Sequence, residues 1–304
     1  MSNVLSGISS LSILVFAVSS MLSAGFSFTF REVVAPFREP SRIARALIGN
    51  FVLAPLLAVI IARALSLDPE LELGLILLGS AAGAPFLIKL IAIAAGDVAL
   101  GTSLLVLLVP MTVVIMPFIV PLLAQDVAVN PLTIAVPLTL AMLLPLALGL
   151  LVTELAPRWA KRRAPIARTV STISLGLVIV TTTIVYIRDV VAIVTSFAAL
   201  AVILFVLGSF AIGYLVASPH TERRLVLGLG TAQRNIAAAT VVAVENMRVP
   251  DSLQVANADA LVLVVVAGVL DLAVLFPVAR WLRHRRDDDA SRRNHDYVRA
   301  PAYD

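Results

Sequence analysis

The chain of 304 residues is 60% hydrophobic and 14% charged, with a mean hydropathy of +1.01, which is far more apolar than a soluble domain and places it in a lipid bilayer. The absence of cysteine excludes disulfides and thiolate metal sites. A net charge of +4, divided among short loops and a tail, gives no reason to expect nucleic acid as a partner.

Apolar runs recur along the whole chain at the length that a helix needs to cross a bilayer, about 20 residues. The alternating segments of an outer-membrane barrel are missing, so the spans are expected to be helices. No Lys or Arg precedes the first span, which we therefore expect to be retained rather than cleaved as a signal peptide. The prediction is an all-α membrane protein with nine transmembrane helices, near residues 9–30, 43–64, 71–94, 98–124, 132–153, 169–187, 190–216, 224–246 and 256–281.

Lys and Arg are divided unevenly between the two sides of this predicted bundle. They gather in the loops between spans 1 and 2, 5 and 6, and 7 and 8, and after span 9, whereas the opposite loops hold only Arg63, Arg188 and Arg248. Because basic loops stay in the cytoplasm, we predict a multi-pass protein of the plasma or inner membrane with its N-terminus outside and its C-terminus cytoplasmic. Residues 1–282 are expected to form one transmembrane domain, and residues 283–304 a disordered tail.

Two predicted spans are interrupted by small and polar residues. The third contains glycine and proline within residues 79–85, and the eighth has a polar stretch within residues 228–235. Pro removes a backbone donor and Gly loosens a helix, so we expect helix breaks at Gly83, Pro85 and Gly230. Paired broken helices are typical of the central site of a transporter. The alternative is that the small residues only allow close helix packing.

The interrupted spans carry the most unusual charges of the chain. Arg234 lies near the middle of the eighth span, where an arginine costs about 2.5 to 3.5 kcal/mol unless it faces a partner or a water-filled cavity. Thr231, Gln233 and Asn235 surround it with further polar groups. Lys89 lies deep in the third span, so we expect a buried functional or ion-paired lysine rather than one that reaches the membrane surface.

Two other spans carry polar groups at membrane depth. Asp271, midway along the ninth span, requires a cation partner or a proton, which leaves two interpretations open: a structural ion pair with Lys89 or Arg234, or a proton-carrying role. Asn50 adds a neutral amide in the second span. Hydroxyl side chains in spans 1 and 6 either line a cavity or bond to their own helices.

Catalytic motifs are missing from the sequence. It has no His-Glu-x-x-His zinc pattern, no Gly-x-Ser-x-Gly elbow and no Walker loop, and its three histidines lie in a loop or the tail. We therefore expect no enzyme, no metal site and no cofactor. A secondary carrier remains both by elimination and from the interrupted spans.

Several short segments resemble the bile acid/sodium symporter superfamily. Residues 96–100 are similar to the family's Gly-Asp-Val-Ala-Leu turn after a broken span, and residues 233–239 are similar to its Gln-Asn-x-x-Leu-Ala segment. Residues 50–55 resemble its Gln-Phe-x-x-x-Pro run. The order and spacing of these segments make the set more specific than any single one.

The resemblance implies a nine-span form of a fold built from inverted repeats. Spans 2–4 and 7–9 would form a core domain in which broken spans 3 and 8 cross, and spans 1, 5 and 6 would form a panel domain. Substrate would bind between the two domains, and the core would move for alternating access. Substrates across the family are mostly organic anions such as bile acids, pantoate-like acids and keto acids.

The third and fourth spans depart from the residues that bind sodium in coupled family members. Alignment on the turn at residues 96–100 places Leu87 and Ile88 at a sodium-binding Ser and Asn. The hydroxyl ligands after the turn fall at Gly101 and Leu105. Neither pair offers a side-chain oxygen.

The eighth span departs from the family in the same way. Alignment on Asn235 places Gly230 at a sodium-binding Glu and Arg234 at a Gln, and only Asn50 keeps a side-chain oxygen. Sodium needs several oxygen ligands, and the fixed charges of Arg234 and Lys89 would repel it. Sodium is therefore doubtful as a coupling ion, and proton coupling through Asp271 is the alternative.

The resulting hypothesis is a sodium-independent secondary transporter that moves a small organic anion by alternating access. Arg234 and Lys89 would hold or balance negative charge, while Gln233, Asn235 and Thr231 would supply polar contacts. One rival is a sodium-coupled organic anion symporter with relocated ligands. Another is a non-transporting membrane sensor or scaffold that acts through the basic tail.

Overall fold

The computed structural model describes residues 2–34, 39–124, 130–217, 221–246 and 258–299, and every regular element within these ranges is a helix. The all-α membrane fold expected from the sequence is confirmed. The elements are α1 (Ser2–Gly25), α2 (Phe30–Val34), α3 (Pro40–Ile48), η2 (Gly49–Leu53), α4 (Ala54–Ala64), α5 (Pro69–Ser80), α6 (Leu87–Ile93), α7 (Val98–Leu123), α8 (Pro131–Leu138), η3 (Thr139–Leu143), α9 (Leu144–Leu155), α10 (Pro157–Val185), α11 (Ile187–Thr195), α12 (Phe197–Val216), α13 (Thr221–Ala232), α14 (Ile236–Asn246) and α15 (Ala258–Arg299).

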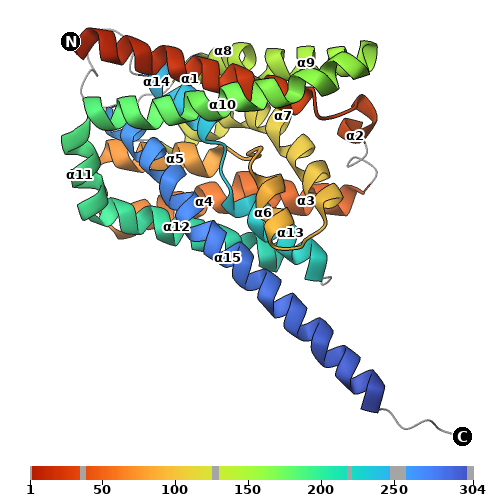
Figure 1. Cartoon of the computed structure of the whole chain (residues 1–304). Coiled ribbons are helices and arrows are strands. Elements are labelled where there is room, and N and C mark those ends of the chain that lie inside the picture. The colour runs from red at the N-terminus through yellow and green to blue at the C-terminus, as the bar shows by residue number, and fades with distance from the viewer. Residues whose placement is uncertain (1, 35–38, 125–129, 218–220, 247–257, 300–304) are drawn as a thin grey trace, which may run out of the picture.

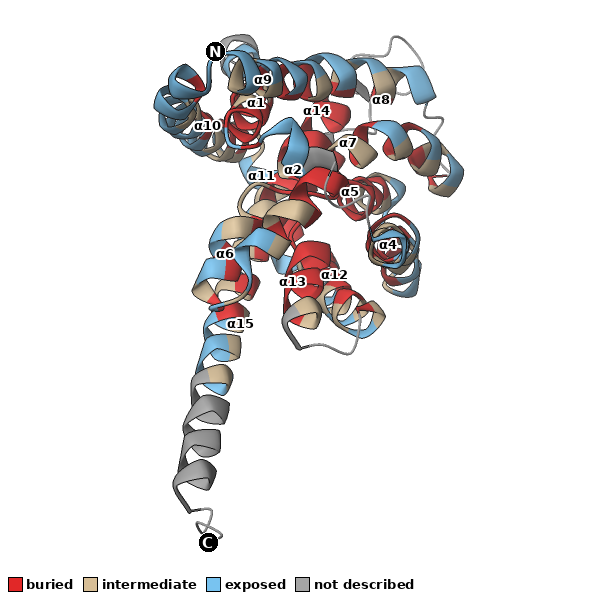
Figure 2. Ribbon diagram, turned by 90° about the vertical axis from the view of Figure 1, so that its right-hand side faces the viewer, coloured by how far each residue is buried: buried red, intermediate tan, exposed pale blue. Residues whose placement is uncertain are grey.

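Among the described residues, 8 helices are long and apolar enough to cross a membrane. The predicted third span does not count among them, because it is divided into α5 with 12 residues and α6 with 7, each too short to cross alone. The count of nine spans therefore stays a prediction. The exposed surface is rich in apolar side chains, as a lipid-facing surface requires, and Figure 2 shows the buried residues gathered between the helices.

The helices pack in two groups. In the first, α1 lies along α10 and α9, and Figure 1 shows these long helices side by side across the top of the molecule. In the second, α12 packs on α13 and α4, and α15 packs on α5 and α12. We call the first group the panel and the second, with α3, α6, α7 and α14, the core. The division of the chain into two such domains stays a prediction, and these contacts are its basis.

Close approach within the panel depends on a pair of glycines. A Cβ added to Gly25 of α1 would lie 2.6 Å from the carbonyl oxygen of Leu146 and 2.8 Å from Cα of Gly149 in α9. No larger side chain fits between these two backbones. The first span is thereby packed firmly against the fifth.

Two predicted segments differ from the sequence expectation. The seventh span begins at Phe197 rather than at residue 190, because Ser196 is extended and its hydroxyl accepts a hydrogen bond from the amide of Ala198 at 3.2 Å, which starts a new helix. Helix α15 extends to Arg299, into the segment expected to be a disordered tail, whose residues 300–304 lie outside the described residues, so the disorder of the tail stays a prediction. Opposite charges spaced four residues apart in this segment of the sequence favour helix, a signal that composition alone does not reveal.

Candidate functional site

The two interrupted spans cross and are fastened to each other by Asn235. Its backbone amide donates to the carbonyl of Ala81 at 2.9 Å, and its side-chain amide donates to the carbonyl of Gly83 at 3.0 Å. Its side-chain oxygen accepts from the amide of Ala238 at 3.2 Å and so caps α14. One asparagine thus satisfies backbone groups of both breaks, and Figure 1 shows the two breaks meeting near the middle of the molecule.

The first break lies between α5 and α6, where the structure places both Gly83 and Pro85. Gly83 adopts φ +80°, and a Cβ there would lie 2.8 Å from the backbone nitrogen of Val109, so only glycine fits without strain. The hydroxyl of Thr112 in α7 accepts from the amide of Ala82 at 3.0 Å and donates to its carbonyl at 2.8 Å. The unwound backbone is therefore paired despite its burial.

The second break lies at residues 233–235, and the expectation of a break at Gly230 is wrong. Gly230 lies inside α13, which continues to Ala232. A Cβ at Gly230 would lie 2.4 Å from Cδ2 of Leu104 and 3.4 Å from Cδ2 of Leu87. This glycine therefore allows close packing of α13 on α6 and α7.

The side chain of Arg234 turns away from the panel into the core. Only 2% of the residue is exposed. Its Nη1 donates to Oδ1 of Asn50 at 3.4 Å, and its guanidinium carbon lies 5.5 Å from the ring centre of Phe205 in α12. Asn50 in the π-turn η2 also donates to the hydroxyl of Thr231 at 3.2 Å. These contacts fix the guanidinium behind the crossing, with Nε and Nη2 buried and unpartnered.

Gln233 and Asp271 form a second buried polar pair. Nε2 of Gln233 donates to Oδ2 of Asp271 at 2.8 Å, and the residues are 4% and 2% exposed. Among the described residues no acidic oxygen lies within 4.0 Å of the guanidinium nitrogens of Arg234, and no basic nitrogen lies within 4.0 Å of the Asp271 carboxylate. The ion pair between Asp271 and Lys89 or Arg234, one of the two sequence-based interpretations, is therefore not formed as a direct contact.

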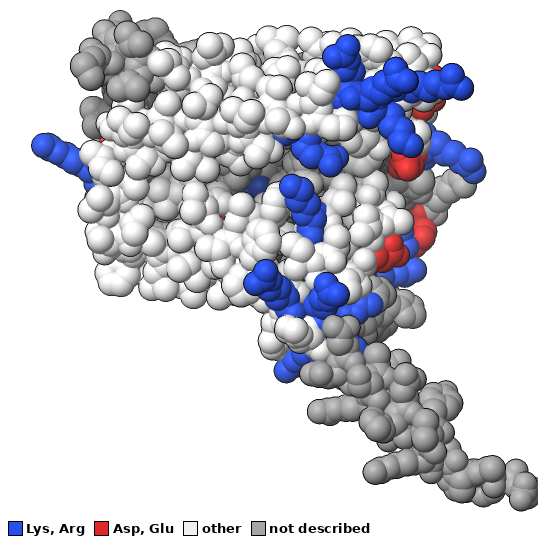
Figure 3. Space-filling model, viewed as in Figure 1, with Lys and Arg blue, Asp and Glu red and all other residues white. Residues whose placement is uncertain are grey.

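A cavity of about 480 Å³ lies between the panel and the crossing. It is lined by α1 and α10 of the panel, by both breaks, and by α15. Three basic residues line it, and none of its described lining residues is acidic. Lys89 of α6 in the core and Arg168 of α10 in the panel are exposed, whereas Arg234 at the second break is buried. Figure 3 shows Lys and Arg side chains on a face whose other residues are mostly uncharged. The cavity is therefore suited to an anion with apolar parts.

Lys89 is exposed, which corrects the expectation of burial or ion pairing. Its Nζ lies 5.3 Å from the ring centre of Phe86, and its side chain borders the cavity. The break before α6 leaves a helix of only 7 residues, and Lys89 lies within it. Among the hydroxyl side chains of spans 1 and 6, those that line the cavity are Ser20, Ser23, Ser27, Ser171 and Thr172.

Arg168 was missed as a cavity residue by the sequence prediction, which assigned it to a loop. Helix α10 begins at Pro157, well before the apolar run that starts near residue 169. This early start carries Arg168 into the helical wall of the cavity. The signal that was available is the set of Ala, Arg and Lys residues in 157–168, which favour helix although Pro165 lies among them, and hydropathy alone does not detect it.

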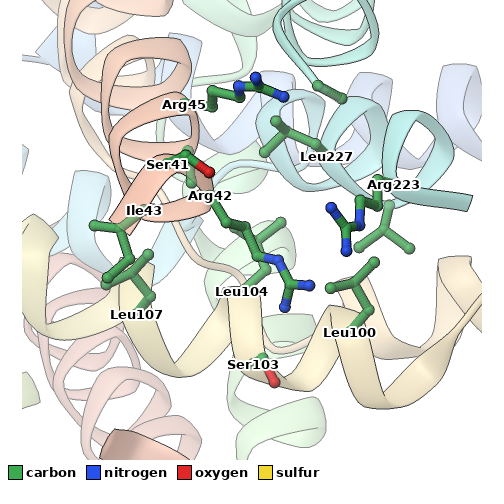
Figure 4. Close-up of a pocket in the computed structure, with 13 residues that line it drawn as sticks. Ser41, Arg42, Ile43, Arg45, Leu100, Ser103, Leu104, Leu107, Arg223 and Leu227 are labelled. Atoms are coloured by element: carbon green, nitrogen blue, oxygen red, sulfur yellow. The ribbon is translucent and has the colours of Figure 1, made fainter. Parts of the chain in front are cut away.

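A second, smaller pocket lies between α3, α7 and α13. Arg42, Arg45 and Arg223 surround it, and Figure 4 shows Arg42 and Arg223 reaching toward its centre. Glu39 lies 2.9 Å from Nη2 of Arg42 and 3.9 Å from Nη2 of Arg223. The carboxylate of Glu39 already contacts both arginines. It thereby links the N-terminal ends of α3 and α13 beside the pocket.

Two positions that the resemblance aligns with sodium ligands have no side-chain oxygen in the described residues, and sodium independence stays a prediction. Leu87 and Gly230 offer no side-chain oxygen, and the described chain contains no cluster of acidic residues, histidine or cysteine that could hold a metal. Oδ1 of Asn50 is already engaged by the guanidinium of Arg234. A cationic side chain therefore lies where the resemblance placed a sodium ligand.

An all-helical membrane protein in which two interrupted spans cross beside a basic cavity is a membrane transporter. A family model described as the Sodium Bile acid symporter family matches residues 13–196. This is more than half of the chain, which therefore belongs to that family, whose members transport bile acids and other organic anions. No curated protein was found to match the chain. The matched range includes Lys89 and Arg168 but ends before Arg234 and Asp271.

Proposed function

We propose that the protein is a secondary carrier that moves a small organic anion by alternating access and without sodium. The observation that carries this proposal is the guanidinium of Arg234, buried behind the crossing and bonded to Asn50 at 3.4 Å. A coupled sodium ion would add a positive charge to this region and be released in each cycle. Arg234 supplies a permanent charge instead, and its repulsion opposes sodium entry.

The substrate would bind in the cavity, where Lys89 and Arg168 are exposed and the guanidinium of Arg234 is engaged by Asn50. Lys89 belongs to the core and Arg168 to the panel, so an anion between them would be held by both groups of helices. Without an anion the two cations repel each other across the cavity. Ser20 and Ser171 add hydroxyl groups, and apolar side chains of α1, α10 and α15 complete the wall. This lining favours an organic acid with an apolar body over an inorganic ion.

The proposed orientation places the C-terminus in the cytoplasm. Figure 3 supports it, because Lys and Arg side chains gather along the edge of the molecule away from the N-terminus. Since the chain has no cysteine, single cysteines can report the two sides. A membrane-impermeant maleimide added to intact cells should label Ser66→Cys and leave Lys161→Cys unlabelled, and the reverse pattern would invert the topology.

Uptake into proteoliposomes tests the function. Radiolabelled cholate and pyruvate, as a large and a small organic anion, are offered with an inward sodium gradient or with choline in its place. We expect uptake of at least one probe at equal rates in both conditions. Uptake that requires the sodium gradient would overturn sodium independence and favour the symporter with relocated ligands.

A further inference from the structure

We propose that Asp271, paired with Gln233, is the binding site for a proton that is transported together with the anion. The inference rests on the proposed function and deepens it, because a carrier whose internal cation is a fixed arginine needs another group to couple transport to a gradient. The pair lies beside the cavity at the second break, where Gln233 belongs to the crossing and Asp271 to α15.

The geometry of the pair accommodates one proton. Nε2 of Gln233 donates to Oδ2 of Asp271 at 2.8 Å, while the other oxygen of each group, Oε1 and Oδ1, is buried without a hydrogen-bond partner. Both of these atoms are acceptors, so neither can satisfy the other. A proton on Oδ1 becomes a donor to Oε1, and the amide and the acid then share two hydrogen bonds in a ring. A single proton would thus satisfy both unpartnered oxygens.

The pair is one side chain away from the cavity. Gln233 lines the cavity, and so do Gly268 and Leu272, which lie three residues before and one residue after Asp271 in α15. Asp271 itself is 2% exposed. A proton from the cavity therefore reaches the carboxylate through a movement of the Gln233 amide, and the site is shielded from water at other times.

The surrounding charges couple the proton to the anion. Arg234 at the crossing acts on Asp271 directly through its charge, and Lys89 on α6 and Arg168 on α10 line the adjoining cavity. The other titratable groups of the helices that pack on α15 lie toward the helix ends: Glu70 and Glu72 of α5, Arg188 and Asp189 of α11, Tyr214 of α12, and Arg223 and Arg224 of α13. The side chain of Glu245 in α14 lies outside the described residues.

Charge balance makes the binding of the two ions cooperative. With Asp271 ionised, its charge offsets that of Arg234, and the buried crossing is neutral. With a proton on Asp271, the charge of Arg234 is uncompensated and adds to the attraction of Lys89 and Arg168 for an anion. By linkage, a bound anion equally favours the proton. One proton and one monovalent anion then move together without net charge.

The transport test compares Asp271→Asn with Asp259→Asn, which removes a carboxylate near the start of the same helix. Asparagine imitates the protonated acid. We expect Asp271→Asn to keep exchange of labelled for unlabelled cholate or pyruvate across the membrane but to lose accumulation driven by an inward proton gradient by tenfold or more. Asp259→Asn should behave like the unchanged protein, whose accumulation a protonophore abolishes.

The outcomes separate this inference from the proposed function. Full gradient-driven accumulation by Asp271→Asn would overturn the proton site and leave the carrier intact. Failure of the unchanged protein to move either probe would count against the carrier instead.

A spectroscopic measurement tests the proton site without any substrate. Infrared difference spectra between low and high pH should show the carbonyl band of a protonated carboxyl group in the unchanged protein and in Asp259→Asn, and its loss in Asp271→Asn. If Asp271→Asn shows this band at the same intensity as the unchanged protein, the proton binds elsewhere and the inference is overturned. The infrared spectra test protonation of Asp271 even if Asp271→Asn does not transport.

Discussion

Arg234 donates to Asn50 at 3.4 Å, and this bond joins the second interrupted span to the π-turn in the second span. It also fixes the direction of the guanidinium, which lies beside the ring of Phe205 in the core, while the residue itself also borders the cavity. The most costly charge of the sequence is therefore internal to the core, and the anion is left to meet Lys89 and Arg168. The predictions below follow from this separation of roles.

Replacing Arg234 with Gln should lower uptake by about tenfold and reduce stability. The change removes the charge that offsets the buried carboxylate of Asp271 and the charged donor of the hydrogen bond to Asn50, and a hydrogen bond to a charged group contributes about 1.5–3 kcal/mol. Arg234→Lys keeps the charge, so its uptake rate and melting temperature should lie between those of the unchanged protein and Arg234→Gln. Thermal unfolding in detergent and initial uptake rates measure both effects. Identical uptake and melting temperature for Arg234→Gln would reduce Arg234 to a space-filling role.

Removing either cavity cation should weaken substrate affinity. We expect Lys89→Ala and Arg168→Ala each to raise KM by about tenfold, because a hydrogen bond to a charged group contributes about 1.5–3 kcal/mol. Both side chains are exposed, so stability should change little. Lys161→Ala, which removes an exposed lysine that does not line the cavity, is the matched control. Equal KM values for Lys89→Ala, Arg168→Ala and Lys161→Ala would mean that the substrate does not bind between Lys89 and Arg168.

The spans and the first break were predictable from the sequence because they depend on local signals. Twenty-residue apolar runs mark helices that cross a bilayer, and glycine followed by proline marks the break that contains Gly83 and Pro85. The break at residues 233–235 is fixed by a long-range contact instead. Asn235 bonds to Ala81 and Gly83, more than 150 residues away, so the break falls after Gly230 rather than at it.

The cavity was harder to predict because it depends on where helices end in space. Hydropathy follows the membrane core and not the helix, so it set the start of the sixth span near residue 169. The helix begins at Pro157 in a basic segment, and this moved Arg168 into the wall. The exposure of Lys89 likewise depends on how far the preceding break shortens α6. The direction of the Arg234 side chain depends on Asn50 and Phe205, which no local pattern connects.

Thr112 should be important for the stability of the first break. Thr112→Val removes the hydroxyl that pairs both with the amide and with the carbonyl of Ala82. An unsatisfied buried group costs about 1–3 kcal/mol, so we expect a clearly lower melting temperature. Thr102→Val is the control, since that hydroxyl donates only to Val98 within the same helix α7 at 2.9 Å. A shift no larger than that of the control would mean that the break is held by Asn235 alone.

Deletion of residues 287–304 should leave transport intact. The cavity, the crossing and the Gln233–Asp271 pair all lie before this segment, and the shortened α15 still contains Trp281 with Arg285 stacked 4.2 Å from its ring centre. Such a basic and aromatic end holds a helix at the membrane surface. Uptake of cholate or pyruvate, normalised to the amount of protein in the membrane, should remain within about twofold of the full chain, because surface changes away from a site alter its energetics little.

A sensor or scaffold that acts through its tail behaves differently: the deletion removes its partner contact while the membrane part persists. Normal membrane insertion together with abolished uptake would therefore show that the tail takes part in the transport cycle, and it would contradict a carrier whose function resides in the bundle.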